Sequence, residues 1–552
     1  MVFVIAGGCC SDASCVPACP VDCIRPLPSD PTFLTTPQLF IDPSACIGCA
    51  ACMYACPVSA IHDEPDLPEA LEPFADVNRR YFEAHPLTPR FLDIQARRAA
   101  SALPARVAVI GAGPSGCYAV EELCAVPGIE VTVIDRLPTP FGLARFGVAP
   151  DHPDTKLISE HFQAVLEHPA VTCWFNVEVG TDVTVSELRA THHAVIYAGG
   201  AADDRRLGIE GEDLAGSFSA REFVAWYNGH PDFADRAFDL GGESAVILGN
   251  GNVALDVARA LARPPDAYAA TDMADHAIAA LGSSAIREVQ IVARRGPAES
   301  ACTLPELIEL RRLPGVEVRT VPAEVASTQA HAYSETVRQK IELFQSVASE
   351  PTPVTPGVRR VTFRFGWTPE RLLGNDVVTG VELRRTSDDD STMRASVHGD
   401  LVLRAVGYRV APTAELPYDG ARSAIANDGG RVLRAGTNEP VPGLYCVGWA
   451  KRGPSGVIGT NRVCSRETVT HLIEDLQAAD LRSLEPGVAD ALLRARKPSH
   501  VTLDQWRHID QAERAAGRDA RPSRPRQKIV HVHEMLHLAA RHPEPPVADA
   551  RS

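Results

Sequence analysis

The sequence predicts an α/β protein in which two Rossmann-like domains follow a small α+β cysteine-rich domain. Three observations support this prediction. Nine of the fifteen cysteines fall within the first 56 residues. Two later segments each combine a buried strand, a glycine-rich turn and a helix. At 552 residues the chain is too long for a single hydrophobic core, so about three domains are expected.

The cysteine-rich domain is predicted over residues 1–62, and its second half carries the most specific pattern in the chain. Cys46, Cys49, Cys52 and Cys56, followed by a proline, have the spacing C-x2-C-x2-C-x3-C-P. This spacing is typical of bacterial ferredoxins, in which three of the thiolates surround one iron–sulfur cluster and the fourth reaches a second cluster. The glycine and alanine residues between the cysteines let backbone N–H groups approach the cluster sulfurs. We therefore predict an iron–sulfur domain.

The same motif ending occurs earlier in the chain, so the domain contains two copies of one motif. In a two-cluster ferredoxin the fourth cysteine of each copy binds the cluster of the other copy. A [4Fe–4S] cluster is accordingly predicted to take one thiolate from the first copy and three from the second: Cys19, Cys46, Cys49 and Cys52. The other cluster is predicted to use Cys9, Cys15 and Cys56.

Asp12 occupies the position at which this other site would usually have its remaining cysteine. A carboxylate is a harder and weaker ligand for that iron than a thiolate. The site is therefore expected to hold either a [3Fe–4S] cluster or a four-iron cluster with one labile iron bound to Asp12. Cys10 competes with Cys9 for the first ligand position, and the motif spacing favours Cys9. Cys23 is expected to be packed in the domain and not to bind iron.

Composition and charge restrict the location of the protein and the partners that it can bind. The chain is 45% hydrophobic, but it has no apolar run of the ~18 residues that a membrane span needs. Residues 2–6 lack a basic flank and are expected to form a strand, not a signal peptide. Cysteines at cluster spacing suit a reducing compartment, so a cytoplasmic location is expected. Residues 1–76 hold ten carboxylates against the single Arg25, which disfavours nucleic acid and would suit docking on a basic surface.

The first Rossmann-like unit begins with a predicted strand over residues 106–110. A glycine-rich turn follows, in which Gly111, Gly113 and Gly116 have the spacing G-x-G-x-x-G, and then a predicted helix. The next strand ends at Asp135. Strand, glycines, helix and terminal acid together form the dinucleotide-binding fingerprint. In it the pyrophosphate lies at the helix N-terminus and the acid binds a ribose hydroxyl.

The pattern recurs after a predicted strand over residues 244–248. Its glycine-rich turn consists of Gly249, Asn250, Gly251, Asn252 and Val253. The following strand ends in Arg294 and Arg295 instead of an acid. A carboxylate would repel a 2′-phosphate, whereas guanidinium groups bind one bidentately. The first unit is therefore predicted to bind a nucleotide with a free ribose, such as FAD, and the second to bind NADP(H).

Three further segments complete the pattern. Strand-then-glycine crossings are predicted over residues 195–200 and 400–407. A glycine-rich helix start is predicted within residues 443–461, where the positive end of a helix dipole can stabilise a reduced flavin. With these segments the chain resembles the adrenodoxin-reductase-like ferredoxin–NADP⁺ reductases, in the bacterial form that is fused to an N-terminal two-cluster ferredoxin. The residues most specific for this resemblance lie in segments 141–153, 249–256, 294–297 and 449–456.

The resemblance implies a FAD domain that is split in sequence. Residues 104–203 and 405–552 would bind FAD, residues 204–404 would bind NADP(H), and residues 63–103 would form a linker. His152 and Glu309 match residues near the nicotinamide, where they would position it or handle protons. The other cofactor contacts that the resemblance implies, besides the glycine-rich turns, are Pro114, Ser115, Leu143, Glu306, Trp449, Gly456, Val457 and Ile458.

The resemblance also implies an activity. NADPH would reduce FAD by hydride transfer, FAD would pass single electrons to the two clusters, and these would reduce an external acceptor such as a ferredoxin or a cytochrome P450. Two alternatives stay open. One is an electron-input flavin and iron–sulfur subunit of a larger complex, similar to the small subunit of glutamate synthase. The other is a ferredoxin half that serves only for docking and relay within a complex. A disulfide reductase is disfavoured, because neither nucleotide domain contains a paired CxxC or CxxxxC.

Two C-terminal segments complete the predictions. His533, Glu534 and His537 match the HExxH pattern of zinc peptidases, but a peptidase needs a third ligand, and His542 does not have the spacing of one. Coincidence is the better account, and residues 529–540 are expected to form a surface helix. Residues 515–528 are expected to be a flexible basic connection.

Overall fold

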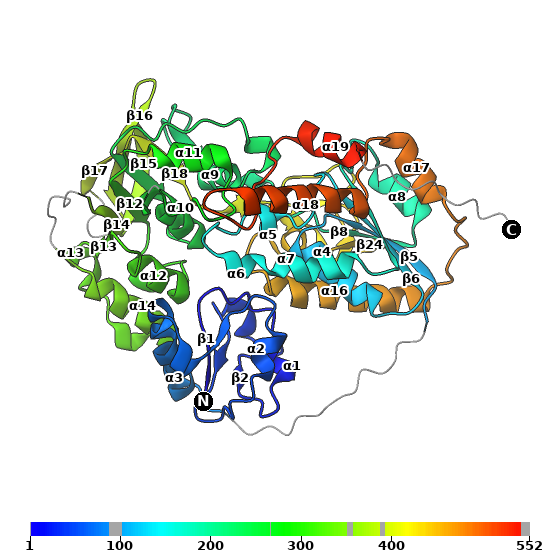
Figure 1. Ribbon diagram of the computed structural model, residues 1–552, viewed down its shortest axis with the longest axis horizontal. Helices are drawn as coiled ribbons and strands as arrows, with labels where there is room; N and C mark the ends of the chain where they lie inside the picture. The colour runs from blue at the N-terminus through cyan, green and yellow to red at the C-terminus, as the bar shows by residue number, and fades with distance from the viewer. Residues whose placement is uncertain (1, 88–101, 265, 350–356, 387–391, 542–552) are drawn as a thin grey trace.

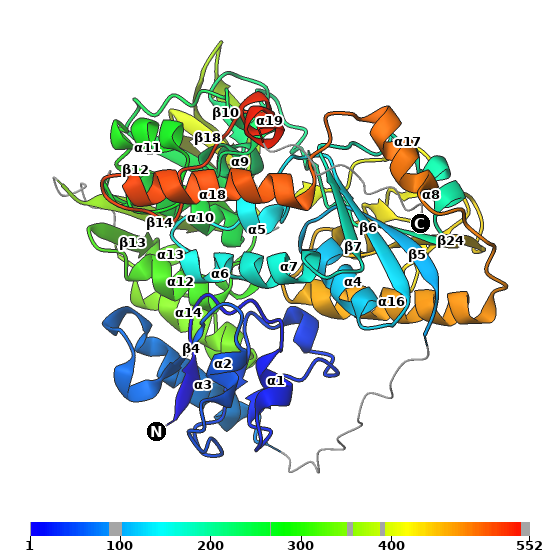
Figure 2. The ribbon, with the colours of Figure 1, turned by 45° about the vertical axis from the view of Figure 1, so that its right-hand side comes forward.

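Figure 1 shows the protein as a computed structural model with a small N-terminal domain below two larger domains, each built around a β-sheet. The turned view of Figure 2 shows the same arrangement, in which the small domain contacts both larger domains. The structure describes residues 2–87, 102–264, 266–349, 357–386 and 392–541.

The N-terminal domain consists of two pairs of short strands and two short helices that follow the internal repeat of the sequence. β1 (Phe3–Ile5) pairs antiparallel with β4 (Ile61–Asp63), and β2 (Ile24–Arg25) pairs with β3 (Phe40–Ile41). Each half contributes one helix, which begins in or beside its cysteine motif: α1 (Cys15–Ala18) and α2 (Ala51–Ala55). The cysteine side chains therefore surround a small apolar core that is shared by both halves.

The predicted linker over residues 63–103 is wrong in its first part, because residues 73–84 form the helix α3 (Pro73–Ala84). Its apolar side chains recur three and four residues apart, which creates one buried face. The Tyr81 ring stacks on Phe40 of the N-terminal domain at 4.0 Å between centroids. The Asn78 amide also bonds to the backbone of strands β1 and β3. This helix therefore belongs to the core of the N-terminal domain, and residues 88–101 lie outside the described residues.

The first large domain contains a seven-stranded sheet that is assembled from two distant parts of the chain. Its strand order is β22-β23-β24-β8-β5-β6-β7. β24 lies parallel to β8, with Leu444 opposite Val195. The strands are β5 (Ala105–Ile110), β6 (Ile129–Asp135), β7 (Val171–Phe175), β8 (Ala194–Tyr197), β22 (Asn427–Asp428), β23 (Arg431–Leu433) and β24 (Pro440–Cys446).

The second large domain is inserted between these two parts. Its six-stranded sheet is parallel throughout, with the order β10-β18-β11-β12-β14-β13. The strands are β10 (Ser217–Ser219), β11 (Ser244–Leu248), β12 (Glu288–Ala293), β13 (Val316–Thr320), β14 (Arg359–Phe365) and β18 (Leu401–Arg404). A three-stranded antiparallel sheet, which the sequence did not predict, adds β15 (Trp367–Gly374), β16 (Val378–Arg385) and β17 (Arg394–His398).

The chain crosses between the two large domains twice, and the two crossings lie side by side. β9 (Asp203–Asp204) pairs antiparallel with β19 (Tyr408–Arg409). The remaining two-stranded pair, β20 (Tyr418–Asp419) and β21 (Ala424–Ile425), lies in the second part of the first large domain. Because the crossings are paired, the inserted domain is attached to the first by two adjacent strands.

Helices cover both sheets. Figures 1 and 2 show α6, α7 and α16 of the first large domain, and α12 and α14 of the inserted domain, above the N-terminal domain. The helices of the first large domain are α4 (Pro114–Cys124), α5 (Leu143–Phe146), α6 (Pro153–Lys156), α7 (Ile158–Leu166), α8 (Val185–Thr191), α15 (Trp449–Arg452), α16 (Thr460–Ala478), α17 (Val488–Arg496), α18 (Leu503–Asp519) and α19 (Val532–Ala540). Those of the inserted domain are α9 (Ala220–Tyr227), α10 (Asn252–Ala262), α11 (Asp275–Gly282), α12 (Leu304–Arg311), α13 (Pro322–Val325) and α14 (Glu335–Ser346).

The prediction of a flexible connection over residues 515–528 is wrong. α18 extends to Asp519, and the basic side chains that follow are paired with buried carboxylates. Arg526 bonds to Asp510 at 2.7 Å and to Glu513 at 2.9 Å. Lys528 is buried and lies 3.0 Å from Asp272 of the inserted domain. The segment therefore clamps the two large domains together, because its charges are neutralised on both sides. The helix predicted over residues 529–540 forms as α19.

Among the described residues, no helix is both long and apolar enough to cross a membrane.

Candidate electron-transfer site

The first glycine-rich turn has the geometry that the dinucleotide fingerprint requires. Gly111 has φ +106°, and a Cβ there would lie 2.6 Å from the carbonyl oxygen of Ala198 at the end of β8. A Cβ on Gly116 would lie 1.9 Å from the carbonyl oxygen of Gly111. At Gly113, by contrast, the nearest atom is 3.9 Å away. The second glycine thus faces open space at the start of α4, where a pyrophosphate could approach the backbone.

Asp135 lies at the end of β6, beside this turn. Its Oδ2 accepts a hydrogen bond from the Ala112 N–H at 2.8 Å, and its Oδ1 accepts one from the Leu137 N–H at 2.9 Å. Burial raises the pKa of this carboxyl group above its usual value. Each oxygen keeps a second lone pair, so the carboxylate can also accept a bond from a ribose hydroxyl.

The second turn repeats this geometry in the inserted domain. Gly249 has φ +117°, and a Cβ there would lie 2.3 Å from the carbonyl oxygen of Ala405 after β18. At Gly251 the nearest atom is again 3.9 Å away, at the start of α10. The side-chain oxygen of Asn252 accepts the Thr303 N–H at 2.8 Å, which fixes the neighbouring loop. Two sites of the same shape are therefore present, one in each large domain.

The two sites differ in the residues that follow their second strand. Arg294 and Arg295 come directly after β12, and both side chains are exposed. Within the described part of the chain, neither guanidinium group has a hydrogen-bond or ion-pair partner. The first site has a carboxylate at this place and the second has two available cations. This difference fits a free ribose in the first site and a 2′-phosphate in the second.

A cluster of charged side chains lies where the two large domains and the N-terminal domain meet. Its centre is Arg259 of α10, which is 1% exposed and lies 3.1 Å from Asp151. Arg259 also contacts Glu306 and donates to Nε2 of His152. The Nε2 atom of His152 is 3.7 Å from the nearest carboxylate oxygen of Glu309. The structure thus brings His152 of the first large domain together with Glu306 and Glu309, which lie one turn apart on α12 of the inserted domain.

Burial and the Arg259 guanidinium lower the pKa of His152, so this imidazole is neutral and its Nε2 accepts the bond from Arg259. Burial and the neighbouring Glu306 carboxylate raise the pKa of Glu309 to about 8, so Glu309 keeps its proton at neutral pH. The three side chains could in geometry hold a cation. Because the Arg259 guanidinium already occupies the centre, we assign no metal there. The sequence analysis missed Arg259, although Asp256 and Arg259 are one turn apart on α10 and form an ion pair.

The glycine-rich block after β24 lies beside the first turn. Asn461 accepts a hydrogen bond from the Ser115 hydroxyl at 2.9 Å, which joins the two segments. The Trp449 ring stacks on Tyr408 at 5.4 Å, and its Nε1 donates to the Ser455 carbonyl. Gly456 has φ +82° and is exposed. Val457, Ile458 and Leu143 are also accessible, so these predicted flavin contacts are free to meet a ligand.

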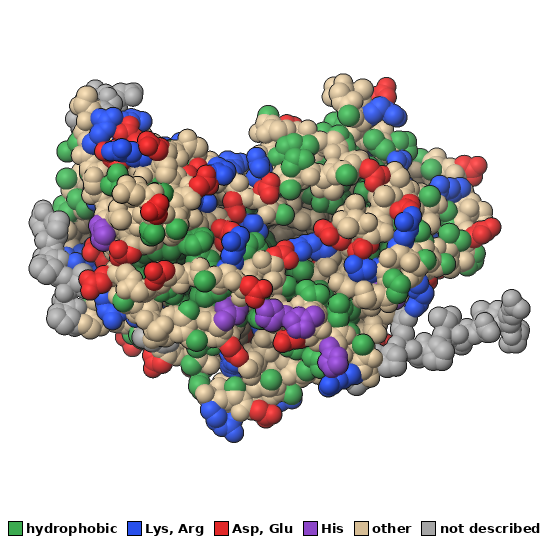
Figure 3. Space-filling model, turned by 90° about the horizontal axis from the view of Figure 1, so that it is seen from above, with side chains coloured by type: hydrophobic (Ala, Val, Ile, Leu, Met, Phe, Trp, Pro, Cys, Tyr) green, Lys and Arg blue, Asp and Glu red, His purple; other side chains and the backbone are tan. Residues whose placement is uncertain are grey.

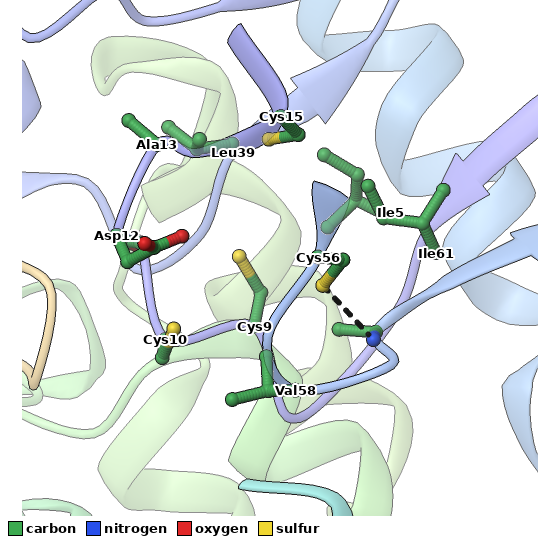
Figure 4. A pocket seen from close by; sticks show the side chains of 12 residues that line it. Ile5, Cys9, Cys10, Asp12, Ala13, Cys15, Leu39, Cys56, Val58 and Ile61 are labelled. Carbon is green, nitrogen blue, oxygen red and sulfur yellow. Dashed lines mark hydrogen bonds between the residues drawn. The ribbon is translucent and has the colours of Figure 1, made fainter. Parts of the chain in front are cut away.

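The cysteines form two groups, the first of which we call the inner site: Cys9, Cys15, Cys56 and Asp12. Figure 4 shows these side chains around one pocket whose other walls include Ile5 and Leu39. Cys10 lies at the edge of the pocket and packs into the core of the first large domain. The grouping agrees with the predicted second cluster, and cluster binding there remains a prediction.

The second group, which we call the outer site, consists of Cys19, Cys46, Cys49 and Cys52. Cys19, Cys46 and Cys49 lie close enough to Cys52 to affect its pKa. Cys49 is exposed, and so are the neighbouring side chains of Ile47 (62%) and Tyr54 (83%). Cys23 is buried as expected, but its sulfur lies 3.4 Å from that of Cys19. The outer site therefore lies at the protein surface.

The thiols of both sites fit iron–sulfur clusters on electrostatic grounds. Burial raises the pKa of the Cys9 thiol to about 11, and the neighbouring Cys56 and Asp12 add to the increase. Burial likewise raises the pKa of Cys52 to about 11, with contributions from Cys19 and Cys46. Several thiolates in one buried place repel one another unless a cation lies between them. Bound iron supplies this charge and keeps the thiols deprotonated.

The loop that carries the inner site is held by both large domains. The Gly459 N–H, at the start of α16, donates to the Cys10 carbonyl at 2.7 Å. The Thr155 hydroxyl donates to the Gly8 carbonyl at 3.2 Å. Arg462 forms a 2.7 Å ion pair with Asp12. On the other side, a Cβ on Gly7 would lie 1.8 Å from Glu309 of the inserted domain. No sequence pattern signalled these contacts, because they join residues at least 147 positions apart.

The HExxH residues His533, Glu534 and His537 lie on α19, and His542 lies outside the described residues. Across the ranges that the structure describes, only His152, Glu306 and Glu309 bring three such ligand atoms within 4.8 Å. Figure 3 shows histidine side chains gathered in a band on one face of the molecule. The His531 and His533 rings stack at 5.5 Å, and His537 contacts Arg541. The pattern is therefore a surface feature of α19, as the sequence analysis expected.

The fold and the site together define a class: an oxidoreductase with two nucleotide-type Rossmann domains and an attached iron–sulfur domain. Residues 105–296 match the family model of the pyridine nucleotide-disulphide oxidoreductases, and residues 39–62 match that of the 4Fe-4S binding domain.

Known proteins refine this class. The probable ferredoxin/ferredoxin–NADP reductase of Mycobacterium tuberculosis is 44% identical over 99% of this chain and 96% of its own length. The protein of the same name from Mycobacterium leprae is 43% identical over 98% of each. The solved structure of Mycobacterium tuberculosis FprA in complex with NADPH is 42% identical, covers 79% of this chain and all of that one, and has a TM-score of 0.74.

The chain belongs to the ferredoxin/ferredoxin–NADP reductase family. The predicted fold class, the resemblance to fused ferredoxin reductases and the prediction of an NADP-dependent oxidoreductase are confirmed. The full-length match also favours this family over a protein similar to the glutamate synthase small subunit. The predicted 4Fe–4S domain is confirmed at residues 39–62.

Proposed function

We propose that this chain oxidises NADPH in its inserted domain and delivers the electrons one at a time, through its own ferredoxin domain, to an external acceptor. FAD, when bound, converts the two-electron hydride of NADPH into single electrons. The observation that carries the proposal is the docked inner-site loop. This loop contacts Gly459, which directly follows the segment Trp449 to Ile458 that we assign to the flavin. It also contacts Glu309, which we assign to the nicotinamide site.

The cofactor contacts follow from the two turns. We assign the FAD pyrophosphate to the start of α4 at Gly113 and the FAD ribose to Asp135. The flavin lies against the segment from Trp449 to Ile458. The NADP pyrophosphate is assigned to the start of α10 at Gly251, and its 2′-phosphate to Arg294 and Arg295. The open space at both second glycines and the unpaired guanidinium groups support these assignments.

His152 and Glu309 are assigned to positioning the nicotinamide. His152 is neutral and Glu309 is protonated, so the pair can orient a ligand by hydrogen bonds without adding net charge. Arg259 donates a hydrogen bond to the His152 imidazole and thereby fixes its orientation, and the Glu306 carboxylate neutralises the charge of the Arg259 guanidinium. Hydride transfer between nicotinamide and flavin needs orientation and exclusion of water more than an acid or base.

Electrons pass from the inner site to the outer site in this proposal. The inner site, which holds the second cluster, is buried against the reductase, and the outer site, which holds the [4Fe–4S] cluster, reaches the surface at Cys49. The acceptor, a ferredoxin or a cytochrome P450, approaches Cys49, Ile47 and Tyr54. Residues 43–57 contain no charged side chain, so this contact rests on apolar surface. A cytoplasmic location is proposed, because cluster thiolates suit a reducing compartment.

An anaerobic NADPH titration tests the proposal, with the flavin followed by absorbance and the clusters by EPR on the same samples. We expect flavin bleaching together with the EPR changes of both clusters. If the ferredoxin domain receives no electrons from the flavin, the flavin bleaches while both clusters stay oxidised. That result, with the clusters still reducible by dithionite, would overturn the relay and leave the reductase in place.

A further inference from the structure

The Asp12 carboxylate accepts hydrogen bonds at both of its oxygens, and none of the donors is a cysteine. Its Oδ1 accepts the Ser14 N–H at 3.0 Å. Its Oδ2 accepts the Ser14 hydroxyl at 2.5 Å and Nη1 of Arg462 at 2.7 Å. Asp12 is only 7% exposed, so water does not compete strongly for these positions. Oδ2 therefore accepts two hydrogen bonds and has no lone pair left for a fourth iron, whereas Oδ1 accepts one and keeps its second lone pair.

Arg462 belongs to α16 of the reductase, 450 residues from Asp12 in sequence. Its Nη1 also donates to the Asp12 backbone carbonyl at 3.3 Å and to the Ser14 hydroxyl. The other side of the guanidinium lies 3.4 Å from Glu121 and 5.9 Å from the centre of the Tyr118 ring. Contacts on several sides hold the guanidinium in one place. Its charge cannot be removed by deprotonation, because arginine stays protonated in proteins.

A permanent cation at this place opposes a fourth iron in two ways. It neutralises the carboxylate, which weakens Asp12 as a ligand for a metal cation. It also repels an incoming Fe²⁺, because two cations would share one partly buried carboxylate. Oδ2 of Asp12 could bind iron only by giving up a bond to Arg462 or to the Ser14 hydroxyl, and Oδ1 could bind it only beside the Arg462 charge.

We propose that Arg462 is a positioning residue that holds Asp12 away from iron, so that the inner site keeps a three-iron cluster while the ferredoxin domain is docked. The inference rests on the proposed function, in that it requires an iron–sulfur cluster at the inner site. It adds that the reductase itself sets the iron content of this cluster. Asp12 then serves as the anchor of the docked loop, and the three thiolates of Cys9, Cys15 and Cys56 bind the cluster.

The reaction that Arg462 suppresses is the uptake of ferrous iron by the reduced cluster. The step is [3Fe–4S]⁰ + Fe²⁺ → [4Fe–4S]²⁺, in which no electron is transferred. The new iron loses its water ligands and forms three bonds to sulfides on the open face of the cluster and one bond to an Asp12 oxygen, while the Arg462 to Asp12 ion pair breaks. The added Fe²⁺ is the only co-reactant.

Iron uptake by the full-length protein tests this proposal. The protein is reduced with dithionite, incubated with Fe²⁺ under anaerobic conditions, freed of excess iron and gently reoxidised. We expect the wild-type chain to regain its full EPR signal of an oxidised three-iron cluster. We expect Arg462→Gln to lose most of this signal and to gain one iron per chain. Arg466→Gln is the matched control, because Arg466 lies one turn further along α16 and pairs with Glu122, away from the loop. It should behave as the wild type.

A second pair of variants separates loss of the cation from damage to the domain contact. Arg462→Lys keeps the positive charge and should restore most of the three-iron signal. In the double variant Arg462→Gln with Asp12→Ala, iron uptake should disappear, because the fourth ligand is gone. Equal iron uptake in the wild type and in Arg462→Gln, or uptake in neither, would overturn the proposal. An inner site that never holds a cluster would instead overturn the proposed function, and the iron content of the untreated protein shows which of the two has failed.

Discussion

The inner and outer cysteine sites come from two copies of one sequence motif, but their surroundings differ: one site contacts the reductase and the other faces solvent. In the inner site Cys15 and Asp12 are buried and Cys9 and Cys56 are partly buried, and its loop is bonded to Gly459, Thr155 and Arg462 of the reductase. The outer site exposes Cys49 between Ile47 and Tyr54, and the surrounding segment carries no charge. The motif repeat alone would make the sites equivalent, and the reductase is what distinguishes them.

In the proposed function, this difference gives electron transfer through the ferredoxin domain a direction. A site that is closed off by the reductase can exchange electrons with the flavin but not with an outside protein. A site at the surface can do the reverse. In the proposed function, the place where the domain docks sets the order of transfer, and fusion of the two parts keeps the docked partner at high effective concentration.

The largest effect should come from removing the outer site. In Cys49→Ser, electron delivery to an added ferredoxin or cytochrome should fall about a hundredfold or more, because loss of a ligand is more severe than loss of an outer partner. Flavin-dependent reduction of ferricyanide by NADPH should stay close to the wild-type rate. Steady-state assays with both acceptors measure this. Cys124→Ser is the control, since Cys124 lies on α4 apart from both sites. Equal loss with both acceptors would show that the two sites are not separate.

The next effect should come from pushing the inner-site loop away. A Cβ on Gly459 would lie 2.1 Å from the Ser11 backbone, so Gly459→Val should displace the docked loop. We expect NADPH-driven reduction of the clusters to slow by about 10- to 100-fold, because small displacements of reacting groups are costly. Stopped-flow absorbance measures the rate. Gly282→Ala is the control, since nothing lies within 4 Å of its Cβ position. An unchanged rate would mean that this contact does not hold the inner site.

The third effect concerns NADPH binding, at the start of the proposed electron path. Replacing Arg294 and Arg295 by alanine removes two free cations and should cost about 1.5 to 3 kcal/mol of NADPH binding, roughly 10- to 100-fold in KM. The KM for NADH should change little, because NADH has no 2′-phosphate. Steady-state kinetics with both nucleotides test this. Arg518→Ala, at an exposed position of α18, serves as the control. A parallel rise in both KM values would contradict the phosphate assignment.

The smallest effect concerns pH. The pKa of Glu309 is raised from its usual value of 4.5 to about 8, so the folded protein holds this proton more tightly than the unfolded chain. The stability that this gives is complete below pH 4.5 and is lost as the pH rises through 8. Between pH 5.5 and 8, the melting temperature of the wild type should therefore fall relative to that of Glu309→Gln.

Above pH 8 the difference between the two melting temperatures should stay constant. Glu534→Gln, at an exposed position, should follow the wild type at every pH. A constant difference from pH 5.5 onward would show that Glu309 is already ionised in this range. The inner-site loop would then lie against a charged carboxylate at Gly7.

Local patterns in the sequence predicted the parts of the site that depend on neighbouring residues. The glycine turns and the cysteine spacing are local, because each glycine or ligand acts through the few residues around it. The three-stranded sheet β15-β16-β17 and the helix α3 were missed, although the buried face of α3 has the helical period.

The contacts that join the domains could not be derived from local patterns. Asp12 was recognised as an unusual residue, but its partner Arg462 is 450 positions away and lies on a helix of another domain. Arg259, which organises His152 and Glu306, has the same long-range character. Such contacts depend on how whole domains pack against each other. They produce no periodic pattern of residues in a single sequence, so they could not be predicted from it.

The order of the two sites is the central claim, and one pair of variants tests it most directly. NADPH is mixed with Cys15→Ser, which disables the inner site, and with Cys49→Ser, which disables the outer site, and the remaining cluster is followed by freeze-quench EPR. Dithionite reduction first confirms that this cluster is intact. The account predicts that NADPH reduces the inner cluster of Cys49→Ser at the wild-type rate but leaves the outer cluster of Cys15→Ser oxidised. Rapid reduction of the outer cluster in Cys15→Ser would contradict it.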